Sequence, residues 1–228
     1  MNKKVKNNFF VILLTCLAIF TLFLTSCSQK NTLINNVSEL RDNVYLGQSE
    51  SFSLSAVSGY KESPYVRDGK VDKVSPYLIF KIDSPTVSNA TYTLSLLYQD
   101  KEYVEEFKLN PINSKLTVNL SIEDFNPTTF NVVISVASLR ETVTMNSLLT
   151  STTLSYTNAL QCLEKVQKSY LDSFADDNGN YQFELSVKLI FKNEKPYWYI
   201  AVITGEDKVK ALLIDGTSSE LLAIREVL

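Results

Sequence analysis

Residues 181–192 read YQFELSVKLIFK, and this alternation of apolar and polar side chains decides the fold of the C-terminal part of the chain. Successive side chains of a β-strand point to opposite faces, so residues two apart share a face. One face carries only apolar or aromatic side chains, namely Tyr181, Phe183, Leu185, Val187, Leu189 and Phe191. The other carries Gln182, Glu184, Ser186, Lys188 and Lys192. The pattern predicts a strand that is buried on one face.

Three further strands are expected after this one. Turn-forming residues at 193–196, 205–207 and 215–218 separate three runs rich in apolar residues, at 197–203, 208–214 and 220–227. Short turns join antiparallel neighbours, so the sequence predicts a four-stranded antiparallel meander.

An amphipathic helix is predicted immediately before residue 181. Apolar side chains recur at helical spacing at Leu160, Leu163, Val166, Tyr170 or Leu171, and Phe174. Ser155 or Thr157 is the expected N-cap, and the polar run DDNGN at 176–180 is the expected end. Together, residues 151–228 are predicted to form a small α+β module.

Parts of this module resemble a known family. The strings YWYIAV (197–202), ALLIDG (211–216) and ELL (220–222) resemble a PepSY-type module of bacterial envelope proteins. The resemblance implies a role in restraining peptidases or in binding close to the membrane. The topology is also similar to cystatin-like folds, but the Gln-Val-Val-Ala-Gly loop of cystatin inhibitors is absent.

Residues 44–150 show β periodicity throughout. Alternating segments such as YTLSL (92–96) and LTVNL (116–120) are separated by turn signals such as Asn110-Pro111 and Asn126-Pro127. Many short strands at this spacing are typical of an antiparallel β-sandwich. The Cys-Trp-Cys arrangement of true immunoglobulin domains is missing, so the prediction is an Ig-like sandwich, and the chain as a whole is predicted to be mostly β.

The N-terminus resembles a bacterial lipoprotein signal peptide. Three lysines precede an apolar run from Phe9 to Leu24, which is long enough for a secretory signal and short for a membrane span of about 20 residues. The following Leu24-Thr25-Ser26-Cys27 resembles the lipobox. The resemblance implies cleavage between Ser26 and Cys27 and attachment of a diacylglyceryl group to Cys27. Two acyl chains give stable anchoring. The alternative is an uncleaved anchor helix.

This interpretation divides the chain into a signal peptide (1–26), a lipidated cysteine with a tether (27–43), the sandwich (44–150) and the α+β module (151–228). The protein is then expected on the extracytoplasmic side of a bacterial cell membrane. Cleavage would remove three lysines and no acid, so the formal charge falls from −3 to −6. Such a charge argues against a nucleic-acid partner, which needs a basic surface.

No catalytic, cofactor or metal site is predicted. The chain has no histidine, which removes the commonest general base and metal ligand. Without histidine, Cys162 lacks the usual partner of a nucleophilic thiol and is expected to be a small core residue. Asp176, Asn178 and Asn180 match the first ligands of a calcium loop, but the required glycine and final glutamate are missing.

The segment 59–77 (GYKESPYVRDGKVDKVSPY) is the candidate binding loop. Its candidate residues are Tyr60, Tyr65, Arg67, Asp68 and Tyr77, because tyrosine and arginine are enriched where protein surfaces bind. The alternative is an exposed hairpin with a two-residue type I′ turn at Asp68-Gly69.

These observations favour a non-catalytic protein that binds another protein or a component of the cell envelope. Two alternatives remain open. One is a regulator or inhibitor of an envelope peptidase, as the PepSY resemblance implies. The other is an unrecognised hydrolase, which would need a pocket with converging carboxylates of perturbed pKa.

Overall fold

The computed structural model describes residues 32–83, 90–111, 114–205 and 208–227. The signal peptide, Ser26, Cys27 and residues 28–31 of the tether lie outside these residues. The chain from Thr32 onward forms one compact unit of mostly antiparallel β-structure, so the mostly β prediction is confirmed. Its elements are the short 3₁₀ helix η1 (Leu33–Asn36), the strands β1 (Val37–Gln48), β2 (Ser53–Glu62), β3 (Val74–Ile82), β4 (Tyr92–Tyr98), β5 (Lys101–Glu106), β6 (Lys108–Asn110), β7 (Lys115–Leu120), β8 (Thr129–Val136) and β9 (Leu139–Ser147), the helix α2 (Tyr156–Asp172), and the strands β10 (Glu184–Lys192), β11 (Lys195–Thr204), β12 (Lys208–Asp215) and β13 (Leu221–Val227).

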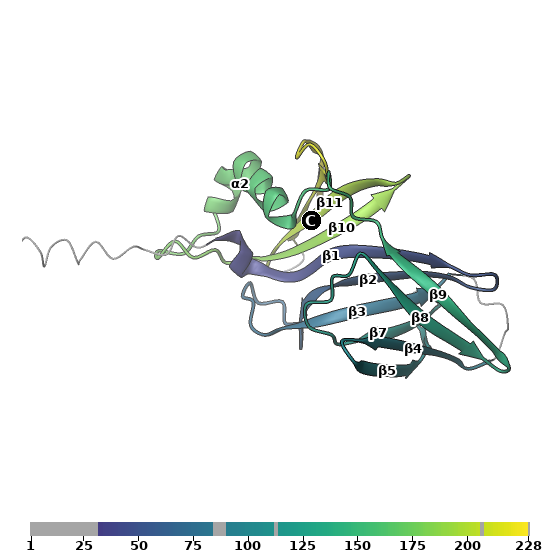
Figure 1. Ribbon diagram of the computed structural model, residues 1–228. Helices are drawn as coiled ribbons and strands as arrows, with labels where there is room; N and C mark the ends of the chain where they lie inside the picture. Colours follow the sequence, from purple (N-terminus) through teal and green to yellow (C-terminus); the bar gives the residue numbers. More distant parts are fainter. Residues whose placement is uncertain (1–31, 84–89, 112–113, 206–207, 228) are drawn as a thin grey trace, which may run out of the picture. The chain divides into compact units, whose positions relative to one another are not determined.

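Strand β1 belongs to both halves of the fold. One edge of β1 pairs with β2 along almost its whole length. The other edge pairs first with β10, in parallel, around Leu40 and Val187, and then with β9, antiparallel, around Gly47 and Met145. Figure 1 shows β1 running between β10 and β2. The N-terminal and C-terminal strands are therefore joined through one shared strand.

The predicted tether was wrong from residue 37 onward. Residues 37–43 form the first part of β1, and Leu40 is buried in the core of the C-terminal half. This strand has no clear apolar pattern in the sequence, because polar residues such as Asn36, Ser38 and Asn43 occupy buried positions in and beside it. Asn36, for example, donates a hydrogen bond of 2.8 Å from Nδ2 to the carbonyl of Phe183.

The pairing of the N-terminal strands branches at β1. From β1 one branch runs through β2, β3 and β7 to β6, and the other runs through β9, β8 and β4 to β5. Only Phe107 separates β5 from β6, so both branches meet on one stretch of chain. The enclosed core contains edge-to-face aromatic pairs, including Tyr45 with Phe130 at 5.1 Å between ring centroids. Such pairs add to the stabilisation from apolar burial.

The C-terminal strands β10–β13 pair antiparallel in chain order, beside helix α2. The apolar stripe of α2, with Leu160, Leu163 and Leu171 buried, shares a core with β10, β11 and β12. Ser155 caps the helix, and its side chain accepts a hydrogen bond from the backbone of Asn158. The predicted helix and its Ser155 cap are confirmed, although the helix ends at Asp172, earlier than expected.

The apolar face predicted for β10 is confirmed, whereas the face predicted to be polar and exposed is partly buried. Phe183 and Leu185 are fully buried, as expected. Glu184 and Ser186, on the opposite face, are buried as well, with exposures of 0% and 7%. The segment that covers Glu184 belongs to the candidate binding loop.

Candidate functional site

The five candidate binding residues are divided between two strands and the connection between them. Tyr60 lies on β2 and Tyr77 on β3, whereas Tyr65, Arg67 and Asp68 lie in the connection 63–73. The three residues of the connection are exposed. Tyr77 is 3% exposed and donates a hydrogen bond of 3.2 Å to the carbonyl of Leu40, so it belongs to the interior.

Two buried glutamates hold the connection. The amide of Asp72 donates to Glu62 Oε1 at 2.8 Å, and the amide of Gly69 donates to Glu184 Oε1 at 3.2 Å. The two-residue turn expected at Asp68-Gly69 is therefore wrong, because β2 and β3 stop pairing at Glu62 and Val74. The connection instead reaches from β2 across to the start of β10.

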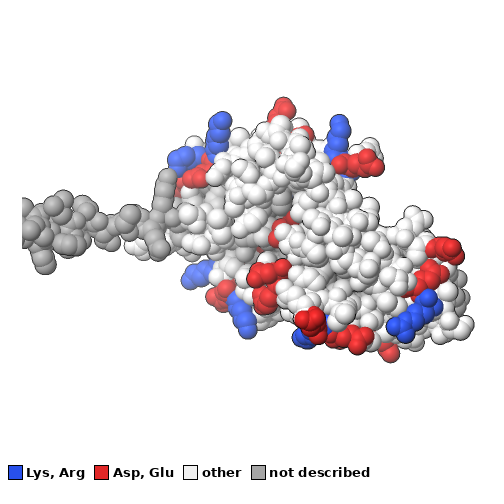
Figure 2. Space-filling model, in the orientation of Figure 1, with Lys and Arg blue, Asp and Glu red and all other residues white. Residues whose placement is uncertain are grey.

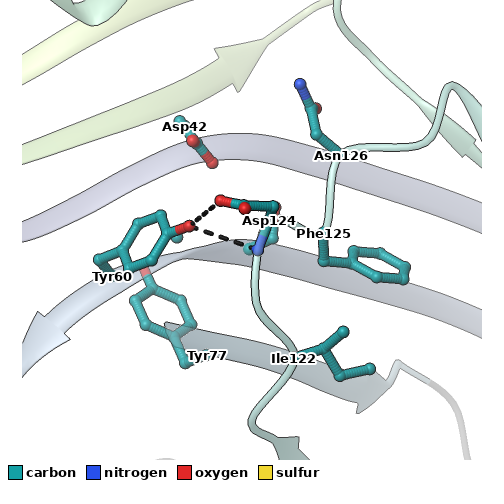
Figure 3. A pocket seen from close by; sticks show the side chains of 9 residues that line it. Asp42, Tyr60, Tyr77, Ile122, Asp124, Phe125 and Asn126 are labelled. Atoms are coloured by element: carbon teal, nitrogen blue, oxygen red, sulfur yellow. Dashed lines mark hydrogen bonds between the residues drawn. The ribbon is translucent and has the colours of Figure 1, made fainter. Parts of the chain in front are cut away.

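A pocket of about 280 Å³ lies next to the strands that flank this connection. Its lining comes from β1, β2, β3 and the connection between β7 and β8, and consists of Asp42, Ser58, Gly59, Tyr60, Tyr77, Ile122, Asp124, Phe125 and Asn126. We call it the Asp42 pocket. Figure 3 shows the carboxylates of Asp42 and Asp124 pointing toward one another beside Tyr60. Two predicted residues, Tyr60 and Tyr77, are therefore brought together with two acids that sequence reasoning missed.

An irregularity in β1 places Asp42 in this pocket. The pairing of β1 with β2 shifts register between Arg41 and Asn43, which leaves Asp42 out of the ladder. Such bulges redirect a side chain. Gly59 makes the close approach possible, because a Cβ atom there would lie only 1.8 Å from the carbonyl oxygen of Leu40.

Hydrogen bonds fix the opposite wall of the pocket. The Tyr60 hydroxyl donates to Asp124 Oδ1 at 2.8 Å, and the backbone amide of Asp124 lies 3.4 Å from the same hydroxyl (Figure 3). Asn43 Nδ2 donates to Asn126 Oδ1 at 2.8 Å and so ties the wall to β1. The pocket is thus held by side chains from separate parts of the chain.

Burial controls the electrostatics of the pocket. It raises the pKa of Asp42 from 3.8 to about 6, against the opposing effects of a backbone hydrogen bond and of the neighbouring Ser58 hydroxyl. Burial also raises the pKa of Tyr45 and of Tyr77 to about 12, so both stay neutral near pH 7. Ser58 is 2% exposed, and its Oγ has no partner at hydrogen-bond geometry. A buried hydroxyl without a partner is costly, which makes Ser58 notable.

Two other pockets are less suited to a specific ligand. One of about 410 Å³ is lined by Tyr65 and Glu62 and by Glu39 and Lys188, which already pair at 2.6 Å. A wider one of about 750 Å³ lies between β1, β2, β10 and the segment after β9. Its lining mixes aliphatic residues with polar ones, and its two charged groups, Arg41 and Glu194, are of opposite sign.

The remaining chemical candidates have structural explanations. Cys162 Sγ donates to the carbonyl of Ser219 at 3.0 Å, and burial raises the pKa of its thiol. Asp176 accepts hydrogen bonds from the amides of Asn178 and Asn180 at 2.9 and 2.8 Å, which accounts for the calcium-like run as a turn.

The described residues contain neither a cluster of side chains suited to metal binding nor a membrane-spanning helix. No group of three or more histidine, cysteine, aspartate or glutamate residues there could hold a metal ion. No helix in the same residues has the length and apolar character needed to cross a membrane.

Nothing in the sequence marks Asp42, since its approach to Ser58 depends on the register of β1 against β2. Asp124 has a weak signal, because Asn126-Pro127 marks a turn beside it. Comparison with family models, with curated proteins and with solved structures gives no match to this chain.

Proposed function

We propose that this protein is a membrane-anchored extracytoplasmic lipoprotein that binds another protein or a cell-envelope component without catalysis, and that the ligand enters the Asp42 pocket. The observation that carries the proposal is a pocket with aromatic walls, the half-buried carboxylate of Asp42 and the buried hydroxyl of Ser58. Binding pockets typically combine apolar walls with a few polar groups that fix orientation.

The lipid anchor is proposed from the sequence alone. The basic start, the apolar run and Leu24-Thr25-Ser26-Cys27 support it. Metabolic labelling of cells with a fatty acid tests it: the natural chain should take up label and Cys27→Ala should not. Equal labelling of both would refute the anchor.

The finer fold assignment belongs to the same proposal. We assign the N-terminal strands to the Ig-like sandwich class and residues 151–228 to a PepSY-like α+β module with a four-stranded meander. The antiparallel pairing of β10–β13 in chain order and the adjoining helix support the second assignment. Regulation of an envelope peptidase follows from that resemblance. A peptidase assay with the full chain and a chain lacking 155–228 tests it.

The binding role is tested by photo-crosslinking on intact cells. A photoreactive amino acid in place of Tyr60, at the pocket rim, should capture a partner, and Asp42→Asn in the same chain should abolish capture. The control position is Leu222 on β13, which is 45% exposed and distant in the strand order. Equal capture from both positions, or capture that persists with Asp42→Asn, would overturn the proposal.

A hydrolase is the second candidate, and one observation favours it. Asp42, with its pKa raised to about 6, lines a pocket together with a second carboxylate, Asp124. Acid–base catalysts use pairs of carboxyl groups in unlike environments. A panel of glycoside, ester and amide substrates tests this candidate. Turnover that is lost in Asp42→Asn would replace the binding proposal with an enzymatic one.

A further inference from the structure

The Asp42 pocket carries acidic groups and no basic ones. Among its nine lining residues, two are aspartates and none is lysine or arginine. Two basic residues lie just outside the lining: Lys61 Nζ is 5.7 Å from the ring centroid of Tyr77, and the charge of Arg41 acts on the Tyr77 hydroxyl. Figure 2 shows acidic side chains both near the middle and along the edges of the visible face, whereas most lysines and arginines lie toward its edges. The pocket therefore favours a positively charged ligand.

The polar groups of the pocket are suited to accept hydrogen bonds. Asp42 and Asp124 supply carboxylate oxygens, and Asp124 already accepts one bond from Tyr60. Ser58 supplies the third group, a hydroxyl at a residue that is 2% exposed. This hydroxyl lies close enough to Asp42 and Tyr45 to lower the pKa of both, but it forms no hydrogen bond of standard geometry, so its oxygen can still accept one from a ligand.

We propose that the Asp42 pocket binds a primary ammonium group at the end of a flexible chain, as in a lysine side chain. An ammonium group has three donors and a compact charge, which suits acceptors that come from β1, β2 and the connection after β7. A guanidinium group would instead require a planar pair of acceptors. This inference rests on the proposed function, since it names the ligand of the same site.

The aromatic walls and the size of the pocket agree with this ligand. Tyr60, Tyr77 and Phe125 line the space, and cations are attracted to the faces of aromatic rings. Tyr77 already makes such a contact, because Lys61 Nζ lies 5.7 Å from its ring centroid, which leaves the rings of Tyr60 and Phe125 for the ligand. A volume of about 280 Å³ is at the lower end for ligand pockets, which start near 300 Å³, and fits a side chain better than a large molecule.

The test is a calorimetric titration of the full-length chain, purified in mild detergent, at pH 7.5. The probes are Nα-acetyl-lysine amide and its Nε-acetylated analogue, which has the same chain without the charge. We expect binding of the first and at least about tenfold weaker binding of the second, since a charge-assisted hydrogen bond is lost. Equal affinity for the two probes, or no binding of either, would overturn the ammonium assignment.

Variants test whether the lysine probe binds in the Asp42 pocket. Asp42→Asn should weaken the lysine probe about tenfold or more, and Ser58→Ala about threefold to tenfold. Asp177→Asn is the matched control, because it makes the same change of charge at an exposed position outside the pocket and should leave affinity unchanged. Equal loss in Asp42→Asn and Asp177→Asn would mean a general effect of charge and would refute the site.

Two further probes separate the possible sources of the amine. Butylammonium represents a small free amine, and glucosamine represents an amino sugar. If the ligand is a lysine side chain, the lysine probe should bind more tightly than butylammonium and glucosamine. Tighter binding of either of these two amines would contradict a lysine ligand. Failure of every ammonium probe, with crosslinking at Tyr60 still dependent on Asp42, would refute this inference and leave the proposed function standing.

Discussion

Replacing Asp42 with asparagine should stabilise the protein at neutral pH while removing its ligand binding. Burial raises the pKa of Asp42 from 3.8 to about 6, so the folded state disfavours the charged carboxylate. Residues kept for binding at a cost in stability are common in functional sites. A gain in stability together with a loss of binding would therefore mark Asp42 as a functional residue rather than a structural one.

The magnitude follows from the shift of the pKa. A shift of about 2 units corresponds to about 3 kcal/mol, at about 1.4 kcal/mol per unit. The cost is absent below pH 3.8, where the group is protonated in both states, grows as pH rises toward 6, and is complete above that value. Asparagine removes this cost but adds amide hydrogens that need partners, which costs about 1–3 kcal/mol. We expect a net gain of up to about 2 kcal/mol at pH 7.5.

Urea unfolding at pH 7.5 and pH 4.5 measures this gain. Fluorescence of Trp198, which is 2% exposed, reports on the C-terminal core, and circular dichroism reports on the strands as a whole. The free energy of unfolding of Asp42→Asn should exceed that of the natural chain at pH 7.5, and the difference should shrink at pH 4.5. Asp177→Asn, the exposed control, should show no such dependence. An Asp42→Asn variant that is less stable at pH 7.5, or a gain that is equal at both pH values, would refute the reasoning.

Three other predictions follow from the same geometry. A neutral Asp42 cannot attract a cation, so the affinity for the lysine probe should fall about tenfold for each pH unit below 6. Titrations at pH 7.5, 6 and 5 measure this change, and a constant affinity would contradict the prediction. Gly59→Ala should destabilise the protein by about 2 kcal/mol or more in urea unfolding, because the new Cβ would overlap the Leu40 carbonyl. Unchanged stability would show that β1 and β2 separate easily at this point. Glu184→Ala should speed hydrogen exchange at the Gly69 amide, because this amide loses its acceptor, and should lower the free energy of unfolding by about 1–3 kcal/mol. An unchanged exchange rate would mean that the Glu184 carboxylate does not hold the connection 63–73.

Local signals in the sequence account for the parts of the fold that were predicted. The alternation at 181–192 gives the buried face of β10, because strand periodicity needs no information from distant residues. The helix is likewise local, since Ser155 caps it and its apolar stripe repeats at helical spacing. Both signals lie within one element of secondary structure.

The errors arise where distant segments meet. The first half of β1 looks like a polar tether, because Asn36 and Ser38 are buried against β10 through hydrogen bonds rather than apolar contacts. Glu184 looks solvent-exposed, because the segment that covers it, around Gly69, lies more than a hundred residues earlier in the chain. Neither contact produces an apolar periodicity that could be recognised in the sequence.

The candidate site shows the same division. Tyr60 was predicted as a binding residue from its residue type and its neighbours, and it does line the pocket. Asp42 was not, because its position depends on a shift of register between β1 and β2 and on the missing side chain at Gly59. Residue types can mark a candidate surface, whereas the pairing of strands decides which acids reach it.

The most direct test of the central claim is a nuclear magnetic resonance titration of the Asp42 carboxyl carbon, with and without Nα-acetyl-lysine amide. In the free protein its pKa should lie near 6, and the bound ammonium group should lower it by stabilising the carboxylate. A pKa near 3.8 that does not change when the probe is added would contradict the claim that the half-buried carboxylate of Asp42 binds a cation.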